Sequence, residues 1–121
     1  ARKNAIVGLA TATVADPDLF SPKRSLDEAV AQLRALPGIG EWTAQYIAMR
    51  ALREPDAFPH TDVALLRALT DKNGQRPSPE ALLTRAEQWR PWRAYAASHL
   101  WAADAAAREE PSPLLENRHD D

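Results

Sequence analysis

The pentapeptide Leu36-Pro37-Gly38-Ile39-Gly40 is the feature that most constrains the fold of this chain. A proline cannot continue a helix, because its ring blocks the preceding turn and it has no N–H group to donate. The two glycines permit backbone angles that other residues resist, and they leave the backbone bare on one side. We therefore expect a tight turn between two helices. The second helix would begin directly after the glycines, with unpaired N–H groups facing outward as a site for an anion.

The rest of the chain predicts an all-α fold. Its 121 residues include ten prolines and four glycines, which suggests several helices separated by proline stops, and no strand pattern competes with them. Ser25 heads a capping box, and Ser78 precedes a proline at the first position of a helix. Helices are expected over residues 1–15, about 26–35, about 40–53, 63–69, about 79–88 and about 91–107.

Residues 1–108 are expected to form the folded region, as one domain or part of one. Residues 109–121 are rich in charge and are expected to be a disordered tail. The first residue is alanine rather than methionine, and it lies inside an expected helix, so we expect a C-terminal piece of a longer protein.

Several side chains are assigned to packing. Trp89 and Trp92 are given core or structural roles, and His99 is expected to be packed or hydrogen-bonded on its helix. The first helix is expected to bury one face at helical spacing, made of Ile6, Leu9, Ala10, Thr13 and Val14.

Composition excludes several classes of site. The chain has no cysteine, so it has no disulfide, thiolate zinc site or iron–sulfur cluster. His60 and Asp62 have no third ligand spaced to complete a metal site. The formal net charge of −2 gives no support to nucleic-acid binding, since many sequence-independent DNA-binding proteins are basic. No apolar run is long enough to span a bilayer and no signal peptide is visible, so no membrane partner is expected and a cytoplasmic setting is compatible.

Three separated motifs resemble one enzyme family. They are L-P-G-I-G-x-W-T-A at 36–44, F-P-H-T-D-V-A-L-L at 58–66 and W-R-P-W-R-x-Y-A at 89–96. Together they resemble the DNA-3-methyladenine glycosylase II family of helix-hairpin-helix base-excision DNA glycosylases, over residues 2–107. The resemblance implies the helical bundle of those enzymes, present here in part. A proline-glycine turn by itself would more often be a plain corner between two helices, and it is the longer match that points to this family.

Asp62 is the catalytic carboxylate that this resemblance implies. Cleavage of an N-glycosidic bond makes the sugar oxocarbenium-like, and a fixed carboxylate stabilises that charge or activates water. The other interpretation is that Asp62 is a helix N-cap, and the two roles are compatible. Thr61 and Val63 depart from the family pattern, in which a second aspartate and an aromatic residue are often found, and this leaves the base preference open.

Trp42 stands where bifunctional relatives carry a lysine that forms a Schiff base. The resemblance therefore implies a monofunctional enzyme that leaves an abasic site. Trp42, Tyr46 and Trp101 would form the pocket for a flipped base, since electron-rich rings attract positively charged alkylated purines. The alternative is that these three aromatic residues are core packing.

The hairpin implies a way of holding DNA. The N–H groups of Gly38 and Gly40, helped by Thr43, would bind phosphate without reading sequence. Family hairpins also bind a monovalent cation, Na⁺ or K⁺, and the matching main-chain carbonyls here are those of Arg34, Leu36 and Gly38. No organic cofactor is expected.

The resemblance predicts a partner and a setting. The partner is double-stranded DNA with alkylated bases, bound by a monomer in the cytoplasm of a bacterium, at the nucleoid. Two other functions stay open from the sequence: a helix-hairpin-helix module that binds DNA without catalysis, and a structural all-α domain that binds proteins.

Overall fold

The structure, a computed structural model, describes residues 2–21 and 25–109, and within these ranges all of its regular secondary structure is helical. The prediction of an all-α fold is confirmed. The elements are α1 (Arg2–Ala15), α2 (Leu26–Arg34), α3 (Glu41–Arg50), α4 (Val63–Ala68), α5 (Pro79–Ala86), the short 3₁₀ helix η1 (Glu87–Trp89) and α6 (Arg93–Glu109).

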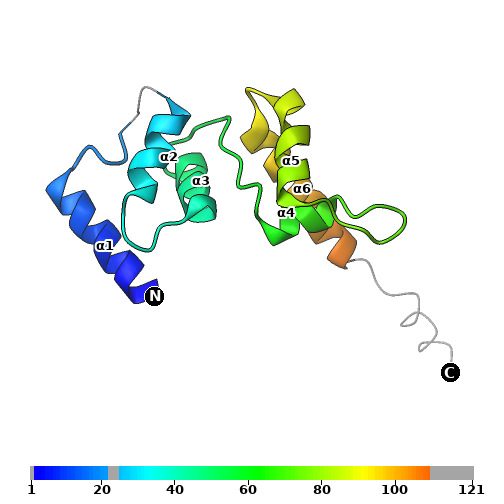
Figure 1. Cartoon of the computed structure of the whole chain (residues 1–121), viewed down its shortest axis with the longest axis horizontal. Helices are drawn as coiled ribbons and strands as arrows, with labels where there is room; N and C mark the ends of the chain where they lie inside the picture. Colours follow the sequence, from blue (N-terminus) through cyan, green and yellow to red (C-terminus); the bar gives the residue numbers. More distant parts are fainter. Residues whose placement is uncertain (1, 22–24, 110–121) are drawn as a thin grey trace.

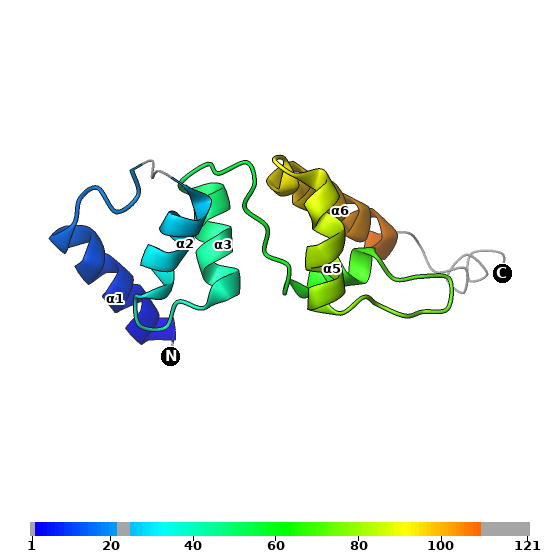
Figure 2. The same cartoon turned by 45° about the horizontal axis from the view of Figure 1, so that its top comes forward.

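The helices form two groups (Figure 1), and the view in Figure 2 shows the same division. We call residues 2–57 the hairpin half and residues 58–109 the C-terminal half. Each half has its own apolar cluster, and the chain passes from one cluster to the other between Ala57 and Phe58. The buried members are Val30, Leu33, Ile39, Ala44, Ala48 and Ala57 in the hairpin half, and Phe58, Leu65, Leu82, Ala86 and Ala97 in the C-terminal half.

The predicted glycine turn joins α2 to α3. Ile39 donates its N–H to the carbonyl oxygen of Leu36 at 3.2 Å, and Gly38 has a φ of 80°. A Cβ atom at Gly38 would lie 2.8 Å from the Cβ atom of Ala5 in α1. Glycine is thus required at position 38 for two reasons: its positive φ angle and the close approach of α1.

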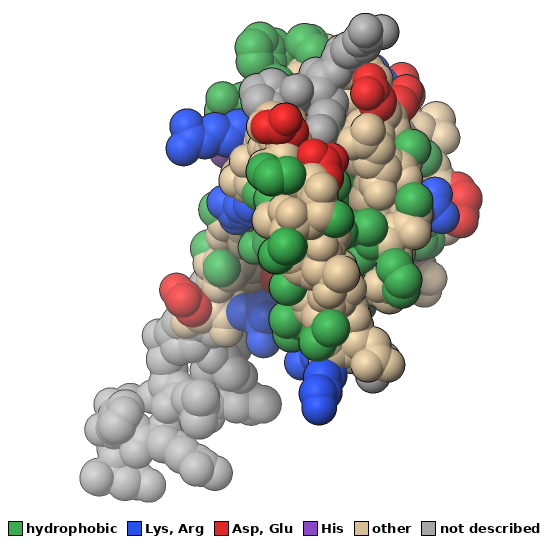
Figure 3. Space-filling view, turned by 90° about the vertical axis from the view of Figure 1, so that its left-hand side faces the viewer, with side chains coloured by type: hydrophobic (Ala, Val, Ile, Leu, Met, Phe, Trp, Pro, Cys, Tyr) green, Lys and Arg blue, Asp and Glu red, His purple; other side chains and the backbone are tan. Residues whose placement is uncertain are grey.

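The expected buried face of α1 is wrong. Ile6 and Val14 are 67% and 83% exposed, and no residue of α1 is fully buried. The helix instead approaches the turn through small residues, since a Cβ atom at Gly8 would lie 3.7 Å from the carbonyl oxygen of Pro37. Close backbone approach, rather than the size of the apolar side chains, decides which face packs. Figure 3 faces this side of the molecule and shows hydrophobic side chains on its surface.

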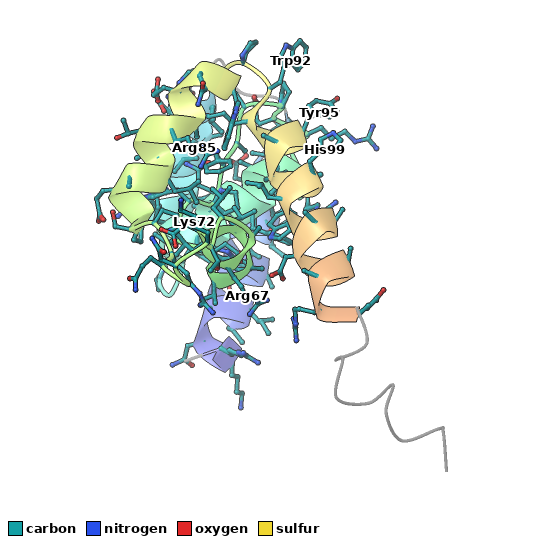
Figure 4. All side chains as sticks on the ribbon, turned by 90° about the vertical axis from the view of Figure 1, so that its right-hand side faces the viewer. Arg67, Lys72, Arg85, Trp92, Tyr95 and His99 are labelled. Carbon is teal, nitrogen blue, oxygen red and sulfur yellow. The ribbon has the colours of Figure 1, made fainter. Side chains whose placement is uncertain are left out.

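Two assignments in the C-terminal half also need correction. Trp92 is 58% exposed and contacts Tyr95, and His99 is exposed as well. Figure 4 shows Tyr95 and His99 on α6 and Trp92 just before this helix, all on one side. Arg93, rather than Trp92, is buried, with 5% of its surface exposed. Arg93 is also the first residue of α6, which begins two residues later than expected. Trp89 is partly buried and packs on the second cluster, as predicted.

Two further expectations concern the C-terminal tail and the membrane. The predicted tail 109–121 lies outside the described residues except for Glu109, which is the last residue of α6. Among the described helices, none combines the length and the apolar character needed to cross a membrane.

Candidate active site

Asp62 is held at the N-terminus of α4 by a short buried loop. Phe58 and Pro59 are buried, and the N–H of Asp62 donates to the carbonyl oxygen of Pro59 at 2.9 Å. Asp62 has extended backbone angles and is the N-cap of the helix: its Oδ2 accepts the N–H of Leu65 at 3.1 Å. The N-cap geometry explains how an acidic side chain can be fixed here.

Two tryptophans complete the surroundings of this carboxylate. The indole Nε1 of Trp42 donates to Oδ1 at 2.8 Å, and the indole Nε1 of Trp101 donates to Oδ2 at 2.9 Å. Three N–H groups from α3, α4 and α6 therefore converge on one half-buried carboxylate. Such donors fix the orientation of a negative charge without neutralising it.

An aromatic cavity lies beside Asp62. Trp42 and Tyr46 are stacked with their ring centroids 5.0 Å apart, and Trp101 meets Tyr46 edge-on at 6.2 Å. Trp42 is 39% exposed, so this side chain is not simple core packing. The cavity has a volume of about 370 Å³ and brings together all four residues predicted for catalysis and base binding. Its lining is Trp42, Tyr46, Arg50, Asp62, Ala64 and Trp101.

Arg50 is a cavity residue that the sequence analysis missed. Its guanidinium carbon lies 5.6 Å from the ring centroid of Tyr46 and 5.8 Å from that of Trp101. A signal was present in the sequence: Arg50 follows Tyr46 by four residues, as Tyr46 follows Trp42, and this spacing places all three on one face of a helix.

A partly buried ion pair fixes α4 against α6. Arg67 binds Asp104 in a bidentate manner, with Nε to Oδ1 at 2.7 Å and Nη2 to Oδ2 at 2.8 Å. These hydrogen bonds lower the pKa of Asp104 and raise that of Arg67. Asp104 follows Trp101 by one helical turn, so the pair also places the indole that reaches Asp62. Sequence reasoning missed it because the partners are 37 residues apart.

A second set of charges ties the start of α6 to the loop before Asp62. Asp56 accepts from Arg90 Nη1 at 2.7 Å and from Arg93 Nε at 3.0 Å. The N–H of Ala94 donates to the carbonyl oxygen of Pro55 at 2.8 Å. These contacts give the arginines of the W-R-P-W-R motif a physical role, since both bind the same carboxylate.

The hairpin turn leaves backbone groups open. Among the caps described for α2 to α5, only that of α3, Gly40, has no side chain bonded to the first turn. Within the described chain, the N–H groups of Gly38 and Gly40 donate to no other group. Thr43 lines a hollow between the hairpin and α1 together with Gly38. The acidic Glu41 beside the turn is paired with Arg34 at 3.1 Å.

Metal ligands of the side-chain type do not gather at this site. The described residues contain no group of three or more His, Cys, Asp or Glu side chains that could hold a metal ion. The carbonyl oxygens of Arg34 and Gly38 accept no hydrogen bond in the same part of the chain, and that of Leu36 accepts one, from Ile39.

The sequence and the fold of this chain were compared with those of known proteins. No protein-family model matches the chain. A Mycobacterium tuberculosis protein named as a probable bifunctional transcriptional activator and DNA repair enzyme AlkA is 52% identical over 73 residues, 60% of this chain. The DNA-3-methyladenine glycosylase 2 of Escherichia coli is 29% identical over 109 residues, 90% of this chain. A solved 3-methyladenine DNA glycosylase from Archaeoglobus fulgidus matches 73% of this chain with a TM-score of 0.63 and 26% identity. In sequence and in fold, the chain is similar to part of the DNA-3-methyladenine glycosylases.

The match to these glycosylases is partial from their side. The chain spans 14% of the Mycobacterium tuberculosis relative, 37% of the Escherichia coli glycosylase and 30% of the Archaeoglobus fulgidus glycosylase. The family resemblance drawn from the three motifs is confirmed. The roles of the individual site residues stay predictions.

Proposed function

We propose that this chain carries the catalytic aspartate and base pocket of a monofunctional DNA glycosylase that removes alkylated bases from duplex DNA. The observation that carries the proposal is Asp62, a carboxylate fixed by three N–H donors at the wall of an aromatic cavity. A flipped base of the 3-methyladenine type would enter this cavity, and the sugar would lie against Asp62.

The hydrogen bonds of Asp62 suggest its mode of action. Each carboxylate oxygen has two lone pairs. Among the described residues, Oδ2 accepts from Trp101 and Leu65, whereas Oδ1 accepts only from Trp42. One acceptor position on Oδ1 is therefore open to the reacting sugar or to water. A carboxylate held in this way acts first as a fixed negative charge that stabilises the oxocarbenium-like transition state.

The cavity residues support a hydrolytic reaction. The described lining contains no lysine, and Trp42 takes the position of the family's Schiff-base lysine. The indole of Trp42 donates a hydrogen bond to Asp62. An indole cannot form a covalent bond with the sugar, so the product would be an abasic site with an intact strand. Stacked rings beside a carboxylate favour a base that is itself positively charged.

The hairpin turn would hold the DNA. Open N–H groups of Gly38 and Gly40 at the start of α3, with Thr43 nearby, suit a phosphate. The carbonyl oxygens of Arg34, Leu36 and Gly38 have acceptor capacity left for Na⁺ or K⁺, which would add positive charge beneath that phosphate. The setting we propose is a monomer acting on the nucleoid DNA of a bacterium.

Base release from methylated duplex DNA tests the proposal, with this chain and with any longer native protein that contains it. Asp62→Asn keeps an N-cap side chain but removes the charge. We expect the variant to release 3-methyladenine at least about a hundredfold more slowly, the loss typical of removing one electrostatic stabiliser. The wild-type protein should free the base without nicking the strand.

Asp27→Asn is the matched control, because it makes the same chemical change on the exposed surface of α2. It should leave base release unchanged. If Asp62→Asn released base as fast as the wild-type protein, Asp62 would be only a helix cap and the proposed mechanism would be wrong. Binding of abasic-site DNA without base release by any form would favour a non-catalytic hairpin module.

A further inference from the structure

Trp42, Tyr46 and Arg50 form a continuous stack along one face of α3. The rings of Trp42 and Tyr46 are nearly parallel, at 15°, and the guanidinium of Arg50 lies over Tyr46 on the next turn. The same guanidinium faces the ring of Trp101 from α6. A planar cation of the chain itself thus already lies against two of the three aromatic side chains of the Asp62 cavity.

Arg50 also separates two hollows. On one side is the Asp62 cavity, and on the other is a hollow of about 330 Å³, also lined by Arg53, Glu54 and Tyr95. Arg50 is exposed and belongs to the lining of both. Among the described residues it forms no ion pair within 4.0 Å. Within residues 2–21 and 25–109 its contacts are with the two rings, so no salt bridge to a described carboxylate holds it in one hollow.

A guanidinium and an N-alkylated purine are similar ligands. Both are flat, both delocalise one positive charge, and a guanidinium is weakly hydrated and stacks on aromatic faces. Two such cations cannot occupy one set of rings together. A base that stacks against the faces of Tyr46 and Trp101 where the guanidinium lies must therefore displace the head group of Arg50.

We propose that the Asp62 cavity is a receptor for planar cations and that Arg50 is its built-in competitor, which leaves the rings for the neighbouring hollow when a cationic base stacks. The biological meaning of this inference rests on the proposed glycosylase function, but its physical content does not. It assigns to Arg50 a part in substrate selection: a base must bind the rings better than the guanidinium does in order to enter.

Binding of a small planar cation tests the inference without any glycosidic bond. N-methylquinolinium is the probe, neutral quinoline is its isosteric reference, and quenching of tryptophan fluorescence gives the affinity. We expect Arg50→Ala to bind N-methylquinolinium about three- to tenfold more tightly than the wild-type protein, the factor typical of a lost, partly exposed cation–π contact. In the variant, N-methylquinolinium should bind several-fold more tightly than quinoline.

Arg85→Ala is the matched control. It removes the same charge and the same kind of contact, since the guanidinium of Arg85 lies 6.0 Å from the ring of Trp89, away from Asp62. This control should leave probe binding unchanged. Arg50→Lys keeps the charge on an ammonium group that stacks less well, so its affinity for the probe should lie between those of the wild-type protein and Arg50→Ala.

Nuclear magnetic resonance gives the independent readout. The side-chain methylene protons of Arg50 should be shifted upfield by the rings in the free protein and should lose that shift when N-methylquinolinium saturates the cavity. Unchanged shifts, or an Arg50→Ala variant that binds the probe no better than the wild-type protein, would overturn the inference. Equal affinity of that variant for N-methylquinolinium and quinoline would also overturn it. These outcomes are independent of base release, so they separate failure of the inference from failure of the glycosylase proposal.

Discussion

The two halves of the molecule are stabilised in different ways. The hairpin half relies on small buried residues, among them Ala29, Ala44 and Ala48, which let helices approach closely around a glycine turn. The C-terminal half has larger side chains in its cluster, and charged pairs hold its elements: Arg67–Asp104 joins α4 to α6, and Arg93–Asp56 joins the start of α6 to the end of the hairpin half. Asp104 and Arg93 are almost fully buried. Close backbone packing thus dominates one half, and specific side-chain bonds dominate the other.

The candidate site lies between the hairpin half and the C-terminal half and takes residues from both. The hairpin half supplies Trp42, Tyr46 and Arg50 on one helix face, together with the open turn. The C-terminal half supplies Asp62 and Trp101, whose relative position is set by the Arg67–Asp104 pair. The comparison suggests that the hairpin half provides an accessible surface and that the C-terminal half provides the precision that catalysis needs. Four predictions test this division, in order of decreasing effect.

Loss of a core side chain should affect mainly the half that contains it. Leu33→Ala in the hairpin cluster and Leu82→Ala in the C-terminal cluster should each lower the free energy of unfolding by about 4 kcal/mol, because both side chains are fully buried. Native-state hydrogen exchange should show faster exchange in α2 and α3 for the first variant and in α5 and α6 for the second. Equal acceleration throughout would mean that the halves unfold as one unit.

Removal of the carboxylate shared by Arg90 and Arg93 should be the next most damaging change. Asp56→Ala removes the carboxylate nearest the buried guanidinium of Arg93, which keeps the main-chain oxygen of residue 56 at 3.0 Å and a longer contact with Glu87 at 3.9 Å. We expect a loss of about 3 kcal/mol in urea unfolding. The control is Glu87→Ala, which breaks the exposed pair between Glu87 and Arg90 together with a longer contact of 3.9 Å to Arg93, and should cost less than about 1 kcal/mol. Similar losses of unfolding free energy for both variants would mean that the buried charge pair stabilises the protein no more than the exposed pair does.

The glycine turn can be tested with two glycines of nearly equal backbone angle. Gly38 and Gly74 have φ values of 80° and 78°, but only at Gly38 would a Cβ atom meet a neighbour, Ala5 at 2.8 Å. Thermal or urea unfolding should show a loss of about 1 kcal/mol for Gly74→Ala, from backbone strain alone, and about 2 kcal/mol for Gly38→Ala. Equal losses would mean that the contact with α1 contributes nothing.

The ion pair between α4 and α6 should make stability depend on pH. The pKa of Asp104 is lowered by its hydrogen bonds to Arg67, so the folded state prefers the ionised form. The resulting stability is present above the unfolded aspartate pKa, about 4, and is lost as pH falls through the lower folded pKa. Urea unfolding at about pH 6 and about pH 3 should show a smaller acid-induced loss for Asp104→Asn than for the wild-type protein. An identical loss in both proteins would contradict this role of Asp104.

The predicted site residues show which inferences can be made from sequence. Asp62, Trp42, Tyr46 and Trp101 were singled out from motifs, and the fold brings all four to one cavity. Arg50 was missed although its helical spacing was visible, because an exposed arginine at a helix end is usually only solvated. The motifs could not say that both indoles would donate to Asp62, since that depends on where α6 lies relative to α3.

Local signals in the sequence determined the helices, their caps and the glycine turn, because proline rings, glycine angles and serine caps act within a few residues. Only the tertiary structure decided which face of α1 packs, which partners Asp56 and Asp104 take, and that Trp92 rather than Arg93 is exposed. Those outcomes depend on contacts between elements that are far apart along the chain. Their geometry follows from the packing of whole helices, which no local pattern encodes.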